Sequence, residues 1–521
     1  MASLQACGAG SGMSSARGAA LLYGITAVAF LVILAGTLFG PYGLFIDEFY
    51  YIACAKRLAW GYVDHPPLSI LILAATRAVL GDSVLAMRLP PALAAAATVL
   101  LAGLVARRLG GGPFAQALAA LATATGPVFL VLGTFYSMNS FELLLWPAVA
   151  LVLVRILDGD APRHWLVVGL LLGLGLENKH TTILLAVAIG AALVFTRARR
   201  HLWTPWPWLG ALLAVLLLLP NLLWQQAHGW PSLEFYRNAQ AFKNIPTPPL
   251  KAIADQILFL GPATFPVWLA GLGYLLFARR SAPYRLLGIA FLVLIAALLA
   301  SHSSRPDRIC GFYPVLFAAG GVALETLSAT PGRRWARGAL LAMVLLGACP
   351  ILPLSLPLLP PQTVAAYAQA IHYLPTIERG KTSPIPQWLA DRTGWEEFVD
   401  DVAAVYRTLS PEDQARVVFY APSYGQAGAL EHFGPSRGLP ARVICRHNSY
   451  WMWSKGRSGP QVLIAVDANP RDLELAFAEH ALVRTHHCDY CMSWRNDARI
   501  EVARGLRVPW GAAWETTKHY E

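Results

Sequence analysis

Two adjacent carboxylates, Asp47 and Glu48, follow the first long apolar segment of the chain. Ionisable groups at such a border are costly to desolvate, so they usually have a partner or a function. Aromatic and charged side chains follow them in the sequence: Tyr50, Tyr51, Lys56, Arg57, Asp64, His65 and Arg88. A base, aromatic rings and several cations suit a reaction on a sugar that is attached to a phosphate. The alternative is that the two acids only cap a helix and add charge to a loop.

The composition identifies the elements that must position these groups as membrane helices. Hydrophobic residues make up 56% of the 521 positions and charged residues only 14%, with a mean hydropathy of +0.48. A soluble globular chain has roughly 25% charged residues, so this chain has too few to cover a surface that faces water. The composition therefore excludes an ordinary soluble protein and predicts a polytopic membrane protein.

The net charge of +11 is unevenly distributed along the chain. Residues 1–360 hold 24 Lys and Arg against 12 Asp and Glu, whereas residues 361–521 hold 17 against 18. The basic excess therefore belongs to the apolar part, where loop charge reports membrane topology. We expect the lipid bilayer as a partner and no nucleic acid.

Apolar segments long enough for membrane spans, which need about 20 residues each, indicate about eleven transmembrane helices. These segments are residues 19–40, 87–109, 113–134, 139–157, 165–177, 180–196, 206–223, 255–277, 284–301, 310–327 and 338–358. Residues 1–18 then form a cytoplasmic N-terminus, and residues 19–360 form the transmembrane domain. The first span is too long for a typical signal-peptide core, so we expect it to be retained.

The charges of the loops predict the orientation. With the N-terminus in the cytoplasm, every compact arginine cluster falls on the cytoplasmic side, as the positive-inside rule requires. These clusters are Arg107-Arg108, Arg155 with Arg163, Arg197-Arg199-Arg200, Arg279-Arg280 and Arg333-Arg334-Arg337. The loop 41–86 and, with an odd number of spans, residues 361–521 then lie on the outer side.

Local patterns predict the structure of these outer parts. In the loop 41–86, Asp47 is expected to cap a helix, and residues 68–80 are expected to form a second helix along the membrane surface. In residues 361–521, short apolar runs at 417–420 and 462–466 predict strands, and residues 395–409 and 472–482 predict amphipathic helices. The fold class is therefore a mostly α-helical polytopic membrane protein with a small C-terminal α/β domain outside the membrane.

Several motifs together resemble one family of enzymes. They are residues 45–51 (FIDEFYY), 61–68 (GYVDHPPL), 81–83 (GDS), 88–90 (RLP), 173–180 (GLGLENKH), 220–232 (PNLLWQQAHGWPS), 312–321 (FYPVLFAAGG), 424–430 (YGQAGAL) and 447–453 (HNSYWMW). In order and spacing these resemble the bacterial membrane glycosyltransferases of the dolichyl-phosphate-mannose protein mannosyltransferase-like family, which have the GT-C fold. The resemblance covers roughly residues 40–520.

The resemblance implies a function. The chain would move a sugar from a polyprenyl-phosphate-linked donor to a cell-envelope acceptor with inversion, on the outer side of the bacterial plasma membrane. Asp47 matches the catalytic acid of the family's first outer loop and would act as the base. His65 stands where some relatives have a lysine that faces the donor phosphate, which puts that contact in doubt. The implied donor- and acceptor-binding residues are Glu48, Tyr50, Tyr51, Asp64, His65, Arg88, Lys179, Arg305 and Arg308.

Other interpretations of these residues stay open. Lys179 could extend to the outer interface without binding anything, and Arg305 and Arg308 could be ordinary loop charges. Glu48 could bind a metal, orient the acceptor or pair with an arginine. The sequence around it offers no close set of metal ligands, so we predict no metal site and leave a divalent cation open.

The C-terminal part contains histidines and cysteines that could also carry chemistry. His486, His487, Cys488 and Cys491 are packed too closely for the usual spacing of a zinc site. A disulfide among Cys445, Cys488 and Cys491 is the favoured interpretation, with plain thiols as the alternative.

Three other functions compete with glycosyl transfer. A transporter or lipid-sugar flippase would place charges near the middle of the membrane on broken helices, often with internal repeats. An O-antigen-type polymerase usually carries arginine-rich outer loops. A structural membrane protein would bind a partner through its outer α/β domain.

Overall fold

The computed structural model describes residues 2–302 and 305–521 and divides into two compact units. Unit 1 consists of Met1–Gly40, Val79–Leu223 and Pro246–Leu358, and unit 2 consists of Pro41–Ala78, Trp224–Ile245 and Leu359–Glu521. Each unit is assembled from three separate stretches of sequence. Residues 41–78 and 224–245 therefore pack with the C-terminal part of the chain.

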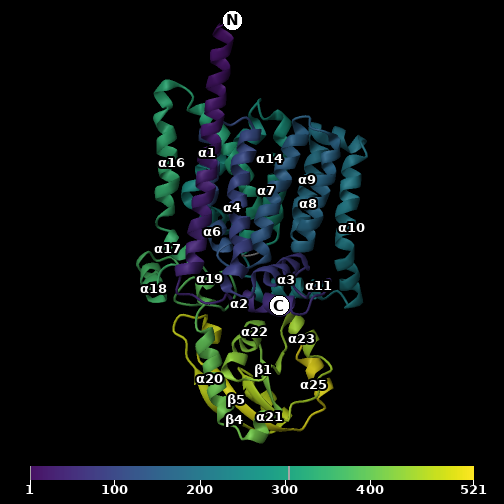
Figure 1. Ribbon diagram of the computed structural model, residues 1–521. Helices are drawn as coiled ribbons and strands as arrows, with labels where there is room; N and C mark the ends of the chain where they lie inside the picture. Colours follow the sequence, from purple (N-terminus) through teal and green to yellow (C-terminus); the bar gives the residue numbers. More distant parts are fainter. Residues whose placement is uncertain (1, 303–304) are drawn as a thin grey trace. The chain divides into compact units, whose positions relative to one another are not determined.

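Unit 1 is built from apolar helices that run side by side (Figure 1). Six helical stretches of the described chain are long and apolar enough to cross a membrane: Gly18–Phe39, Val84–Arg108, Met138–Leu157, Trp206–Ala227, Ala282–Ala300 and Pro306–Leu327. They correspond to α1 (Ala2–Phe39), α4 (Val84–Arg108), α7 (Met138–Leu157), α10 (Trp206–Ala227), α14 (Arg285–Ala300) and α15 (Tyr313–Leu327). This confirms a mostly helical, multi-pass membrane protein.

Three further segments pass the same test only as bent pairs. They are α5 (Pro113–Thr125) with α6 (Pro127–Gly133), α9 (Thr182–Phe195) with the 3-10 helix η2 (Arg197–Trp203), and α12 (Pro249–Leu260) with α13 (Phe265–Phe277). Two expected spans correspond to the shorter helices α8 (Trp165–Asn178) and α16 (Trp335–Ala348). At 1.5 Å per residue, a helix of 14 residues is shorter than the roughly 30 Å of a bilayer core. The number eleven stays a prediction.

Glycines let the helices of unit 1 approach closely. A Cβ atom at Gly320 of α15 would lie 1.9 Å from the carbonyl oxygen of Val267 in α13, and one at Gly271 of α13 would lie 1.9 Å from that of Leu316. Small residues at such contacts are the usual way in which membrane helices pack, because the backbones gain van der Waals contact. The two glycines that end the motif at 312–321 therefore have a packing role in this chain.

The C-terminal part of unit 2 contains a five-stranded sheet with the order β2-β1-β3-β5-β4. Strand β1 (Val417–Ala421) pairs in parallel with β2 (Val443–Cys445) and β3 (Val462–Val466). Strand β5 (Ala498–Leu506) pairs antiparallel with β3 and with β4 (Phe477–His486). The predicted strands at 417–420 and 462–466 are confirmed, and so is the predicted helix at 395–409, which is α20 (Trp395–Arg407).

The helix expected at 472–482 is wrong over its second half. Helix α24 (Pro470–Ala476) ends there, and Phe477–His486 forms the edge strand β4. The side chains of β4 are mostly exposed, so the segment shows no clear alternation of apolar and polar residues. Its conformation is set by pairing with β5, which is a tertiary effect that overrides local preference.

The loop 41–86 contains two helices, α2 (Ile46–Ala55) and α3 (Leu68–Leu80). Helix α2 packs against α22 (Tyr424–Phe433). A Cβ atom at Gly425 would lie 2.3 Å from Ile46 Cγ1, and one at Gly428 would lie 2.7 Å from Phe49 Cβ. Two glycines of the motif at 424–430 thus bring α22 against the helix that carries Asp47.

Candidate functional site

The structure separates the roles of the two adjacent acids. Phe45, not Asp47, is the residue that precedes α2, and the Oε2 atom of Glu48 accepts a hydrogen bond of 2.7 Å from the backbone N–H of Phe45. Glu48 is completely buried. The expectation that Asp47 caps the helix is wrong, because the acid in the third helical position can reach back to the capping residue and the one in the second position does not.

The Asp47 side chain is half-buried and points to a different partner. Its Oδ1 atom accepts a hydrogen bond of 2.7 Å from the hydroxyl of Tyr424, the first residue of α22. Asp64 has a matching arrangement, since its Oδ1 atom accepts a hydrogen bond of 2.8 Å from the hydroxyl of Tyr50. The rings of Tyr50 and Tyr424 stack with centroids 4.8 Å apart. Two carboxylates and two tyrosines therefore form one group, which we call the Asp47 cluster.

A third part of the chain supports this cluster from behind. The Tyr50 hydroxyl lies 2.7 Å from the Oγ atom of Ser449, which also accepts a hydrogen bond of 3.1 Å from the backbone N–H of Val63. Ser449 lies on the short helix α23 (Asn448–Ser454) and is buried. Tyr50 is thereby held between the outer loop and the C-terminal domain.

Lysines lie close to the Asp47 cluster. Lys243 attracts the Asp47 carboxylate electrostatically, whereas Asp64 and Glu378 repel it. Lys243 forms an ion pair of 3.5 Å with Glu378, and Lys381 forms one of 2.6 Å with the same carboxylate. The isolated bridge between Asn244 and Glu378 joins these two stretches of backbone. Cations from two further segments thus reach the region of Asp47.

The surroundings raise the pKa of Asp47 above its ordinary value. Burial is the largest cause, and the charges of Asp64 and Glu378 act in the same direction. The hydrogen bond from Tyr424 and the charge of Lys243 oppose this effect. A carboxylate whose pKa is raised in this way is a stronger base than an exposed aspartate.

His65 and Tyr51 lie behind the cluster. The His65 side chain is completely buried, and its Nδ1 atom lies 3.0 Å from the carbonyl oxygen of Pro66. Its ring packs against the rings of Tyr50, Tyr51 and Tyr62 at centroid distances between 4.9 and 5.8 Å. This packing gives His65 a structural role. The contact between residue 65 and the donor phosphate stays a prediction, and the burial of His65 among aromatic rings does not favour it.

In unit 1 the structure brings together three of the predicted cations. The Nζ atom of Lys179 lies 2.7 Å from Glu142 and 3.8 Å from Asp307. Arg305 forms an ion pair of 3.1 Å with Asp307, and Arg308 acts on the same carboxylate electrostatically. We call these five residues the Lys179 cluster. Arg88, on α4 of the same unit, is buried.

The Lys179 cluster makes a testable prediction about stability. Lys179→Met is expected to lower the free energy of unfolding by about 3–5 kcal/mol, because it leaves Glu142 buried without its counter-ion. Adding Glu142→Gln should recover most of the loss. Thermal unfolding of the purified protein in detergent measures both effects. The control is Lys251→Met, which removes an exposed pair with Asp255 and is expected to cost less than about 1 kcal/mol. Equal shifts for the two lysines would contradict the prediction.

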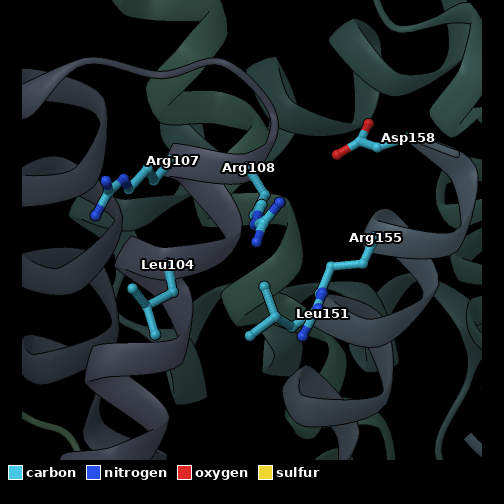
Figure 2. Close-up of a pocket in the computed structure, with 6 residues that line it drawn as sticks. All are labelled: Leu104, Arg107, Arg108, Leu151, Arg155 and Asp158. Carbon is cyan, nitrogen blue, oxygen red and sulfur yellow. The ribbon is translucent and has the colours of Figure 1, made fainter. Parts of the chain in front are cut away.

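A cavity of about 670 Å³ in unit 1 has a different character (Figure 2). Its lining residues are Leu104, Arg107, Arg108, Leu151, Arg155 and Asp158. The arginines lie in the last turns of α4 and α7, whereas Glu142 lies near the opposite end of α7. Arg155 is paired with Asp160 at 2.8 Å. None of the predicted site residues lines this cavity. Its arginines are among those whose positions predict which ends of the helices face the cytoplasm.

The cysteines and the alternative metal sites can also be placed. Cys445, Cys488 and Cys491 are all free thiols, so the favoured disulfide among them is absent from this structure. Cys445 is buried in β2, whereas Cys488 and Cys491 follow β4. Within residues 2–302 and 305–521, no group of three His, Cys, Asp or Glu side chains has an arrangement that could hold a metal ion.

Sequence reasoning missed Tyr424, Lys243, Lys381 and Ser449. Tyr424 and Ser449 lie in the motifs at 424–430 and 447–453. The sequence therefore indicated these segments through the family resemblance, but it assigned no role to either residue. Lys243 and Lys381 belong to no motif. They reach Asp47 only through the folding of unit 2.

Comparisons with known proteins agree with this architecture. Residues 64–224 match the family model described as dolichyl-phosphate-mannose-protein mannosyltransferase. ArnT from Cupriavidus metallidurans, solved bound to undecaprenyl phosphate, is 16% identical with a TM-score of 0.59, over 93% of this chain and 97% of that one. A search among curated proteins gives no match.

Two larger enzymes share the fold over part of their length. The arabinofuranosyltransferase AftD from Mycobacteria is 16% identical with a TM-score of 0.54, over 93% of this chain and 40% of that one. The oligosaccharyltransferase of Archaeoglobus fulgidus is 13% identical with a TM-score of 0.52, over 81% of this chain and 63% of that one.

The family match over residues 64–224 and the fold define the class of protein that the chain resembles, the membrane glycosyltransferases with the GT-C fold. The resemblance to the dolichyl-phosphate-mannose protein mannosyltransferase-like enzymes, indicated by the motifs, is confirmed.

Proposed function

We propose that this glycosyltransferase moves a sugar from a polyprenyl-phosphate-linked donor to a hydroxyl of a cell-envelope acceptor, with Asp47 as the base. The donor class is supported by the description of the matching family and by the undecaprenyl phosphate bound to ArnT. The observation that carries the assignment of the base is the half-buried Asp47 carboxylate, held by Tyr424 and flanked by Asp64 and Lys243.

The chemistry follows from these groups. Asp47 takes the proton of the acceptor hydroxyl while that oxygen bonds to the anomeric carbon of the sugar. The bond between the anomeric carbon and the phosphate oxygen breaks, and polyprenyl phosphate leaves with the electron pair. Attack from the side opposite the leaving group inverts the anomeric configuration. Tyr424 holds the carboxylate in one orientation, so the base is positioned before the acceptor binds.

The leaving phosphate needs neutralisation of its charge more than it needs a proton. In the proposed mechanism, Lys243 and Lys381 of unit 2, which lie in the region of Asp47, supply this. In unit 1, each of the three cations of the Lys179 cluster, Lys179, Arg305 and Arg308, interacts with a carboxylate. A phosphate that binds there would compete with Asp307 for the same cations.

The proposed location is the bacterial plasma membrane, with Asp47 and the α/β domain on the outer side. Support comes from the arginines around the cavity in Figure 2, which end α4 and α7 and favour the cytoplasm under the positive-inside rule.

The experiment that tests this function is a transfer assay with the purified protein in nanodiscs. Undecaprenyl-phosphate-linked hexoses, pentoses and amino sugars are supplied with an extract of cell-envelope lipids and glycans, and products are identified by mass spectrometry. Transfer from at least one monophosphate donor is expected. The alternative, a flippase, predicts movement of a fluorescent lipid-linked sugar across a vesicle membrane without product, and that outcome would contradict the proposal.

The hydrogen bond and the neighbouring charge at Asp47 make a prediction about pH. A base must be ionised, so kcat/KM should fall as the pH drops through the pKa of Asp47. Tyr424→Phe removes a hydrogen bond that lowers this pKa, so the acid limb should move to higher pH. Asp64→Asn removes a negative charge that raises it, so the limb should move to lower pH. Shifts of the two variants in the same direction would rule out Asp47 as the titrating base.

A further inference from the structure

A C-x-x-C motif in the C-terminal domain has no part in the proposed reaction. Cys488 and Cys491 lie in the turn after β4. Cys488 is partly exposed, whereas Cys491 is buried. The Sγ atom of Cys491 donates a hydrogen bond of 3.0 Å to the carbonyl oxygen of Cys488, and each thiol affects the ionisation of the other. The sulfur atoms are thus already neighbours.

A histidine and an aspartate are aligned on Cys488. His486, the last residue of β4, is buried, and its Nε2 atom and the Cys488 Sγ atom both border Gly394. On its other side, the Nδ1 atom of His486 lies 2.8 Å from the Oδ2 atom of Asp401 on α20. Asp401 also forms an ion pair of 2.5 Å with Arg484 of β4. The order Asp401, His486, Cys488 is that of an aspartate that orients a histidine, which in turn activates a nucleophile.

The backbone makes room for this arrangement. Gly394 has a φ of +73°, and a Cβ atom at this position would lie 2.4 Å from Cys488 Sγ and 3.8 Å from His486 Nε2. The buried guanidinium of Arg495 lies 3.8 Å from the centroid of the Trp395 ring and attracts both thiolates electrostatically. Gly394 therefore leaves space for the Cys488 sulfur atom, and the buried guanidinium of Arg495 attracts the thiolate form of that sulfur.

These contacts favour the thiolate of Cys488. The hydrogen bond from Cys491 is the largest cause that lowers the pKa of Cys488 to about 4, and the contacts with His486 and Arg495 add to it, while burial opposes them. The hydrogen bond to Cys488 and burial both raise the pKa of Cys491. Burial opposes protonation of His486, but its bonds to Cys488 and Asp401 raise its pKa. Asp467 also faces His486 electrostatically.

We propose that Cys488 and Cys491 form a redox-active dithiol that reacts with disulfides by thiol–disulfide exchange, with Cys488 as the attacking and Cys491 as the resolving residue. A structural disulfide or a pair of inert thiols would not need the Asp401–His486 pair. The division into one accessible and one buried sulfur is what such an exchange requires.

The exchange is balanced in two steps. The Cys488 thiolate attacks one sulfur of a disulfide, forming a mixed disulfide and releasing the other sulfur as a thiolate. Cys491 then loses its proton, which the released thiolate accepts, and attacks Cys488 Sγ, so that the second sulfur of the substrate leaves. The two cysteines lose two electrons and the substrate disulfide gains them, becoming one thiol and one thiolate, which takes its proton from water. The reverse sequence reduces the pair again.

Two disulfides of different size test this in the full-length protein in detergent. Oxidised glutathione and the protein insulin are each incubated with the reduced Cys491→Ser variant, and peptides are read by mass spectrometry. A mixed disulfide on Cys488 is expected with at least one of them, and none in Cys488→Ser. Reaction with glutathione alone would indicate a small-molecule partner, and reaction with insulin would indicate a protein partner. No adduct with either would overturn the proposal.

The role of the aspartate is tested by a matched pair of neighbours on α20. The rate at which iodoacetamide alkylates Cys488 is followed against pH, and in the wild type its midpoint is expected well below the roughly 8.5 of a free cysteine. Asp401→Asn and His486→Asn should move the midpoint to higher pH. Asp400→Asn, whose carboxylate instead pairs with Arg437, should leave it unchanged. A wild-type midpoint near that of a free cysteine would overturn the proposal, and these measurements do not depend on sugar transfer.

Discussion

Asp47→Asn is expected to reduce kcat for sugar transfer by about a hundredfold to ten-thousandfold, the usual contribution of a general base. The amide has the size of the carboxylate and can still accept the hydrogen bond from Tyr424, so the folded structure should be retained. What is lost is the ability to take a proton from the acceptor hydroxyl. The measurement is single-turnover transfer from the active polyprenyl-phosphate donor, with thermal unfolding recorded in parallel.

The neighbouring acid provides a control with the same chemical change. Glu48 is buried and bonded to the backbone N–H of Phe45, so Glu48→Gln should keep most of the activity. It should lower the free energy of unfolding by about 0.5–2 kcal/mol, as expected for a weakened helix cap. Full transfer by Asp47→Asn would exclude Asp47 as the base. Loss of activity in Glu48→Gln with retained stability would show that the assignment has been made to the wrong member of the pair.

Gly271→Ala is expected to lower the stability of the protein by disturbing the contact between α13 and α15. The added Cβ atom would lie 1.9 Å from the carbonyl oxygen of Leu316 and 2.8 Å from the backbone nitrogen of Gly320. Neither atom can rotate away, so α13 and α15 must move apart along their contact. Overpacking of this kind costs about 1–3 kcal/mol and occasionally more. The thermal midpoint in detergent and the fraction of monodisperse protein are both expected to fall.

Gly273, two residues further along α13, is the matched control. A Cβ atom there would meet nothing within 4 Å. Gly273→Ala should therefore be neutral or stabilise the protein by up to about 1 kcal/mol, because alanine is the better helix former. If both substitutions lowered the thermal midpoint equally, close packing of α13 on α15 would not be the cause.

Local sequence patterns predict only part of the candidate site. The importance of Asp47 was predictable, because an acid after an apolar span and the surrounding motif both pointed to it. The sequence did not show which of the two acids caps the helix. That depends on the three-dimensional structure, in which Glu48 turns back toward Phe45 and Asp47 turns toward α22. Lys243 and Lys381 belong to no motif, and only the bridge between Asn244 and Glu378 brings them to the same region.

By itself, the sequence determined that this protein lies in a membrane, that most of it is helical, and which family of glycosyltransferases it resembles. These properties follow from the amount of apolar surface, the period of apolar residues and short motifs, all of which are local. Only the tertiary structure decided that β4 is a strand, that Tyr424 holds Asp47, and that His486 lies between Asp401 and Cys488. Each of these depends on residues far apart in the chain, and the free energy that selects them comes from contacts that exist only after folding.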